Sequence, residues 1–144
     1  MFSIWTILRI IFSLIFTLCC IYFTQFISAI EAKKKCPLSE GWRITNGKVL
    51  GSLLMIIGIV NIFVPANKFL STLPIIGSSY VVLFILILFS ELFIINRLSI
   101  NINDSNNSKC KIKGYDFLID YFSKKTFNEC IYITLVISIL FFYL

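Results

Sequence analysis

One acidic side chain, Glu91, stands inside a long apolar stretch of the sequence, between the runs VVLFILILFS and LFII. An ionisable residue within a membrane span is costly to bury and is a functional candidate by default, for example on a proton or ion path. The obvious polar companions within the other apolar runs are Asn61 and Gln25, and neither of these side chains titrates. The alternative is a structural carboxylate near the membrane surface, paired with a cation such as Arg97.

The cysteines offer a second chemistry. Cys19 and Cys20 are adjacent within an apolar run, and packing is their simplest role. Cys36 and Cys110 fall in two polar loops, where the sequence leaves open a disulfide between them or a thiol nucleophile. There is no Cys-x-x-Cys spacing and no histidine, so the sequence predicts neither a metal site nor a cofactor.

The common catalytic motifs are missing from the sequence. It has no glycine-rich phosphate loop, no nucleophile elbow and no pair of catalytic carboxylates. Because histidine is absent, the commonest general base is absent as well. We therefore expect a protein that is not an enzyme.

These candidate residues are set in a sequence that is typical of membrane proteins. Of its 144 residues, 58% are hydrophobic and 14% are charged, whereas soluble domains average about 45–50% and about 25%. A helix needs about 20 apolar residues to cross the hydrocarbon core, and in lipid each span must satisfy its own backbone hydrogen bonds. We predict one all-α integral membrane domain over residues 1–144, with four transmembrane helices at about 10–30, 49–64, 75–95 and 127–144.

Two basic polar stretches, 31–48 and 97–126, are expected to connect these helices on one side of the membrane. Within the second stretch, Asn101 to Ser108 reads NINDSNNS and is predicted to be non-helical. It contains glycosylation sequons at Asn103 and Asn106.

A short amphipathic helix is predicted before the last span. Its apolar face is made of Phe117, Leu118, Tyr121 and Phe122. Such a helix would lie along the membrane surface or dock on a partner protein.

Small residues recur on the predicted spans. Gly47, Gly51 and Gly58 fall near one face of the second helix, close to Asn61, and Gly77 begins a Gly-Ser-Ser patch in the third. Glycines let helices approach closely in lipid, and an amide can form a hydrogen bond across the contact. We expect these residues in helix packing.

The distribution of charge predicts an orientation. With four spans, eleven of the thirteen Lys and Arg fall in the two basic loops, and only Arg9 and Lys68 remain for the other side. The positive-inside rule then places the loops in the cytoplasm, or in a matrix or virion interior, with both termini opposite. On this orientation the two sequons are unused. Arg9, inside the first apolar run, is expected to extend its guanidinium to the lipid headgroups.

The triplet Lys33, Lys34 and Lys35 directly follows the first apolar run. We expect it to set the topology and to attract anionic lipid headgroups, at about 1 kcal/mol per residue. The expected partners are therefore the lipid bilayer and other protein subunits, and not nucleic acid.

These features predict a non-catalytic multi-pass protein that is a structural or assembly component of a larger membrane complex. Frequent Ile, Lys and Asn and scarce Ala are typical of AT-rich coding. Two settings fit this bias: the internal membrane of a large DNA virus, as a minor capsid-associated protein, and an organelle inner membrane, as a respiratory accessory subunit. The alternative is a small oligomeric transporter or channel, with Glu91 and Asn61 lining the path.

Overall fold

Each of the long apolar runs forms a helix in the computed structural model of the chain. The structure describes residues 3–32, 41–65, 68, 71–72, 74–104 and 114–143. The helices of these regions are α1 (Ile4–Ala32), α2 (Trp42–Phe63), α4 (Pro74–Asp104), α5 (Asp116–Ser123) and α6 (Phe127–Tyr143). No strand occurs in the described regions, which confirms the predicted all-α class.

Three helices, α1, α2 and α4, are long and apolar enough to cross a membrane. Helix α6 has 17 residues, which is the short end of the spanning range of about 17–25. It follows α5 at an angle of 111°, and the two helices are together long and apolar enough to cross a membrane if they form one bent span. The chain is thus an all-α membrane protein with three to four helices of spanning length.

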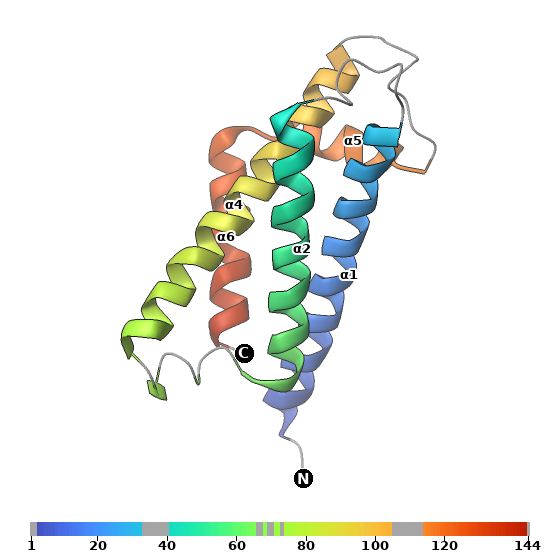
Figure 1. Ribbon diagram of the computed structural model, residues 1–144. Coiled ribbons are helices and arrows are strands. Elements are labelled where there is room, and N and C mark those ends of the chain that lie inside the picture. The colour runs from blue at the N-terminus through green and yellow to red at the C-terminus, as the bar shows by residue number, and fades with distance from the viewer. Residues whose placement is uncertain are drawn as a thin grey trace.

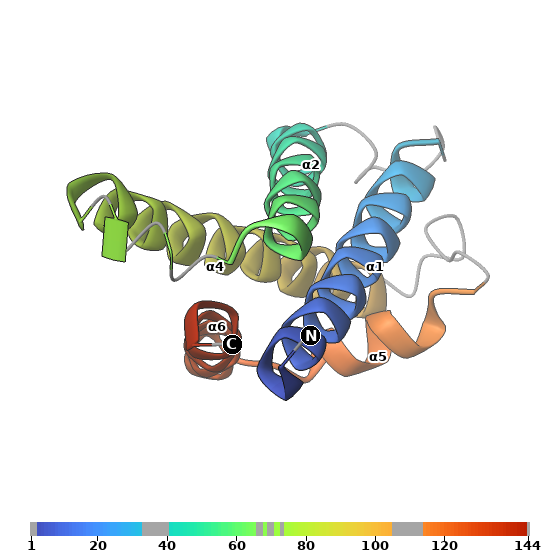
Figure 2. The same ribbon diagram turned by 90° about the horizontal axis from the view of Figure 1, so that it is seen from below.

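The long helices run up and down the bundle (Figure 1). Helices α1 and α2 lie side by side and antiparallel, and α4 passes between α2 and α6 (Figure 2). The start of α4 leans away from α1 and α2, whereas its second half crosses them near the start of α2. The first turn of α1 and the last turn of α6 lie at one end of the bundle, and α5 lies near the other.

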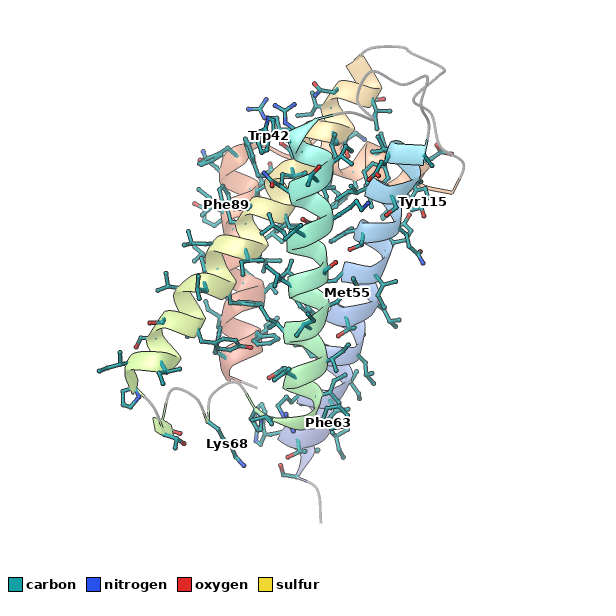
Figure 3. All side chains as sticks on the ribbon, in the orientation of Figure 1. Trp42, Met55, Phe63, Lys68, Phe89 and Tyr115 are labelled. Atoms are coloured by element: carbon teal, nitrogen blue, oxygen red, sulfur yellow. The ribbon has the colours of Figure 1, made fainter. Side chains whose placement is uncertain are left out.

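The two ends of the bundle carry side chains that suit a membrane surface (Figure 3). Trp42 and Tyr115 lie at the end where α2 begins, and Lys68 lies at the opposite end. Amphipathic aromatic rings and lysines are enriched at the level of the headgroups. The line between these ends is therefore the direction in which the bundle would cross a bilayer.

Clusters of aromatic rings fasten α6 and α5 to the other helices. Away from α5, Phe84 of α4 stacks on Phe141 of α6 with ring centroids 4.5 Å apart, and Phe16 of α1 packs against both rings. Nearer α5, Phe23 of α1 meets Phe122 of α5 edge-on at 5.7 Å. Such pairs contribute about 0.5–1.5 kcal/mol each beyond the burial of their area.

The helices extend further than the predicted spans at the end of the bundle where α2 begins. Helix α2 starts at Trp42 instead of near Val49, and α4 continues to Asp104 instead of ending near Ile95. The non-helical prediction for residues 101–104 is therefore wrong. Ile102 in this turn is buried in the core, and its burial outweighs the weak helix propensity of the Asn and Ser residues around it.

The predicted amphipathic helix is present as α5, but its buried face differs from the prediction. Leu118, Ile119 and Phe122 are buried in the bundle, whereas Phe117 is 80% exposed. Helix α5 packs mainly on α4, so only one narrow side of it is covered. The ring of Phe117 instead stacks on that of Tyr121, 6.0 Å away, on the outer side.

One buried amide holds α5 against α4. Asn96 of α4 donates from Nδ2 to the carbonyl of Phe122 at 2.6 Å and to the carbonyl of Lys125 at 2.8 Å. These carbonyls lie at the C-terminal end of α5 and just beyond it, where the last C=O groups of a helix lack the usual intrahelical donors. The Phe122 carbonyl also accepts from the backbone N–H of Lys125 at 3.2 Å. Asn96 therefore acts as a cap supplied by a neighbouring helix, a role that no pattern in the sequence indicates.

Candidate functional site

Glu91 is buried inside the bundle, on the side of α4 that faces α1 and α2. Its side chain is only 1% exposed, and within the described residues neither carboxyl oxygen has a hydrogen-bond partner. None of the ion pairs found there includes Glu91, and the guanidinium of Arg97 lies over the ring of Phe93 instead, at 5.1 Å. The alternative of a surface carboxylate paired with Arg97 is therefore not what the structure contains.

The approach of three helices places this carboxyl. Gly51 of α2 lies opposite Glu91, and a Cβ atom added there would lie 3.3 Å from Glu91 Oε1 and collide with the hydroxyl of Thr24 on α1. The Thr24 hydroxyl donates to the backbone carbonyl of Cys20 at 2.8 Å. Because a hydroxyl has one proton to donate, Thr24 cannot also donate to the nearby carboxyl.

A cavity of about 210 Å³ adjoins Glu91. Its walls come from α1, α2, α4, α5 and α6, and they are almost entirely apolar. The lining includes Phe12, Phe16, Cys20, Leu92, Tyr121 and Ile137. Glu91 is therefore a single carboxyl in the wall of an otherwise apolar cavity.

The cavity reaches the outer surface of the bundle where α1 and α5 line it. Ile15 and Cys19 of α1 belong to its lining and are exposed, and so is Tyr121 of α5. On a membrane-spanning bundle this surface faces lipid. A molecule dissolved in the bilayer therefore has a lateral route to the cavity.

A second buried polar cluster joins α1 to α2. Asn61 donates from Nδ2 to the hydroxyl of Ser13 at 2.6 Å, and Arg9 donates from Nη1 to the backbone carbonyl of Asn61 at 2.6 Å. All three residues are buried. The expectation that Arg9 extends to the headgroups is therefore wrong: its guanidinium turns inward and binds a carbonyl near the C-terminal end of α2, which carries negative partial charge.

The two predicted intramembrane polar residues are both buried, but they belong to different clusters. Glu91 lies opposite Gly51, whereas Asn61 lies further along α2 with Ser13 and Arg9. At a rise of 1.5 Å per residue, the separation along α2 is about 15 Å. The sequence could identify both residues as buried polar groups, but their positions along the helices decide that they do not meet.

The predicted packing glycines lie on buried faces. At Gly47 an added Cβ would come within 2.6 Å of Ile27 Cδ1, and at Gly58 it would collide with the Thr17 hydroxyl. Gly77, in the first half of α4, is also buried. The absence of a side chain at Gly47 and Gly58 is what allows α1 and α2 to pack closely.

Several predicted residues lie outside the described regions. They are Lys33, Lys34, Lys35, Cys36, Asn106 and Cys110. Asn103 of the other sequon lies in the last turn of α4, where its amide donates to the Ser123 hydroxyl at 3.2 Å. Cys20 is buried and Cys19 is exposed, both at the cavity.

No protein family, curated protein or solved structure matches this chain. Among the described residues, no group of three or more His, Cys, Asp or Glu is placed to hold a metal ion. The chemistry that the described site offers is therefore a buried carboxyl in an apolar cavity, with two cysteines in the same wall.

Proposed function

We propose that this chain is a non-catalytic, multi-pass membrane protein that is a structural or assembly component of a larger membrane complex. The supporting observation is the open form of the bundle. In the most apolar stretch of each long helix, only 28% of α1, 28% of α2 and 33% of α4 is buried inside the chain. Most of the surface of these helices is therefore available to lipid and to other subunits.

The first half of α4 is the surface that we expect a partner helix to contact. Ile75 is 85% exposed there and Val82 is exposed as well. Ser78 and Ser79 follow Gly77, and their hydroxyls bond to carbonyls of their own helix, those of Pro74 and Ile75. Small residues allow close approach in lipid, and hydroxyls that are already bonded add no unsatisfied donor to the contact.

The proposal extends to orientation and setting. We propose that the basic loops face the interior compartment and that both termini face the opposite side, because of the charge asymmetry of the sequence. Residue usage fits both the internal membrane of a large DNA virus and an organelle inner membrane, and of these two settings we propose the first.

Gentle detergent extraction from the native membrane, followed by native mass analysis, tests the assembly role. We expect the chain to emerge in a stoichiometric complex with larger proteins. Ser78→Phe should reduce the yield of this complex, because a large ring blocks close approach of a partner helix. Ser52→Phe on the exposed side of α2 is the matched control. Recovery of the chain alone, or as a small homo-oligomer, would contradict the proposal.

A small oligomeric transporter or channel is the second candidate, and the burial of Glu91 beside a cavity favours it. In that case Glu91→Gln should abolish ion or solute flux into vesicles while leaving assembly intact. Glu129→Gln is the control, because Glu129 is exposed in the first turn of α6. Unchanged flux in Glu91→Gln would remove this candidate.

A further inference from the structure

We propose that the cavity beside Glu91 binds a small hydroxyl-bearing amphiphile from the bilayer. Its hydroxyl would bind the Glu91 carboxyl, and its hydrocarbon body would lie between the aromatic and aliphatic walls. This binding site is separate from the helix surfaces that the proposed assembly role uses.

The buried carboxyl of Glu91 needs a hydrogen-bond partner. Buried polar groups in proteins are nearly always hydrogen-bonded, because an unsatisfied group loses its hydration without compensation. Glu91 is almost fully buried, and within the described residues both of its carboxyl oxygens lack a partner. The Thr24 hydroxyl, which lies near, donates to Cys20 instead. A group that enters the cavity and reaches Glu91 would satisfy it.

The chemistry of the cavity selects a hydroxyl as that group. A hydroxyl both donates and accepts, so it pairs with a carboxyl in either protonation state. An ammonium group would bring a second charge into an apolar site, where the cost of desolvation offsets the attraction. A water molecule needs about 2–4 polar partners, and the walls are almost entirely apolar apart from Glu91.

Size and access define the rest of the ligand. The cavity of about 210 Å³ is larger than an apolar cavity of about 150 Å³ that takes benzene, so a single ring or a short alkyl chain fits. The exposed lining residues Ile15, Cys19 and Tyr121 open it sideways toward lipid. A molecule that partitions into the bilayer would therefore enter at the side where α1 and α5 line the cavity.

Photolabelling of the full chain in phosphatidylcholine nanodiscs tests the proposal. The probe is 1-octanol carrying a diazirine on its chain, and labelled peptides are identified by mass spectrometry. We expect labelling of α1 and α6 at the cavity lining, near Cys19 and Ile137, and suppression of this labelling by excess 1-octanol. The matched probes are the octane diazirine, which has no polar group, and the octylamine diazirine, which is cationic.

Three variants separate binding from folding. Glu91→Leu removes the hydrogen bond, which is expected to lower labelling by the alcohol about tenfold, whereas Glu91→Gln keeps a donor and an acceptor and should retain it. Ile137→Trp fills the cavity from the half-buried face of α6 and should block labelling with Glu91 in place. Circular dichroism and size-exclusion profiles check that each variant is folded.

The proposal is overturned by any of three results in folded protein. These are equal labelling by the octane and octanol probes, stronger labelling by the octylamine probe, and unchanged labelling by the octanol probe in Glu91→Leu. The first would make the cavity a purely apolar pocket, and the second would make Glu91 a partner for cations.

Discussion

The hydrogen bond between Asn61 and Ser13 links α1 and α2 inside the membrane-spanning bundle. Both side chains are buried, and the Nδ2 to Oγ distance is 2.6 Å. In lipid such bonds contribute less than a dry interior suggests, about 0.6 kcal/mol on average and about 1.7 at most, because the separated helices also find partners. Arg9 bonds the backbone carbonyl of Asn61, so its bond survives a change of the Asn61 side chain.

A double-mutant cycle with Ser13→Ala and Asn61→Ala should therefore give a coupling free energy of about 1 kcal/mol. The measurement is the free energy of unfolding in mixed micelles with increasing dodecyl sulfate. The control cycle pairs Ser13→Ala with Ser52→Ala, which lies on the exposed side of α2. Additive effects in the Ser13 and Asn61 cycle would mean that this hydrogen bond does not stabilise the bundle.

Helix packing depends on positions where a side chain is missing. Gly58 contacts Thr17 and Phe16 of α1 so closely that an added Cβ would collide with the Thr17 hydroxyl. The neighbouring helix cannot give way easily, because Phe16 is itself held between Phe84 and Phe141. The contact of α1 with α2 at this level therefore requires glycine.

Gly58→Leu should destabilise the bundle by about 1–3 kcal/mol, which is the usual cost of overpacking. The same unfolding assay measures it. Ser52→Leu adds a similar side chain on the exposed side of α2 and should change stability by less than about 0.5 kcal/mol. If the two variants were equally stable, close packing at Gly58 would not be a source of stability.

The attachment of α5 depends on Asn96, which lies on a different helix. Its amide caps the carbonyls of Phe122 and Lys125. Replacement by leucine removes this donor from both carbonyls, and the Phe122 carbonyl keeps the backbone N–H of Lys125. The expected cost is about 1–3 kcal/mol. The effect should be local, because α5 is short and packs mainly on α4.

Asn96→Leu should therefore raise amide hydrogen exchange in α5 about tenfold or more and leave exchange in α1 and α2 unchanged. Exchange in nanodiscs, read by mass spectrometry, gives this comparison. Asn128→Leu, at an exposed position in the first turn of α6, is the control. Uniform acceleration in all helices would indicate global destabilisation instead of a lost cap.

The bundle as a whole has two chemically different ends. Arg43, Lys48, Lys124 and Lys125 lie at or near the end where α2 begins and α5 crosses, and Lys68 lies at the other. Lys48 also pairs with Glu31 at 2.8 Å, which joins the end of α1 to the start of α2. The proposed orientation follows from this difference.

In bacteria, a phosphatase that works only outside the cytoplasm should therefore be active when it is fused after Leu144. A fluorescent protein that matures only in the cytoplasm should not fluoresce when it is fused at the same position. The same reporters fused after Gly114, in the second basic loop, should behave in the opposite way. A fluorescent fusion at Leu144 would contradict the proposed orientation.

Much of the fold could be predicted from the sequence because the bilayer acts on each segment separately. An apolar run of sufficient length must form a helix in lipid, whatever its neighbours are. This requirement predicts the long helices and the all-α class, and the amphipathic pattern around Phe117 predicts the short helix before the last one. It placed the helix ends less well, because burial of Ile102 extends α4 into an Asn-rich turn.

The relation between polar residues depends on how the helices are rotated and displaced against each other, which is set by packing and not by hydrophobicity. The sequence singled out Glu91 and Asn61 as buried polar residues. It did not indicate that Asn61 would join Ser13 and Arg9, or that Glu91 would face Gly51 and a cavity without a hydrogen-bond partner in the described regions. Contacts of this kind arise only when α1, α2 and α4 are packed together.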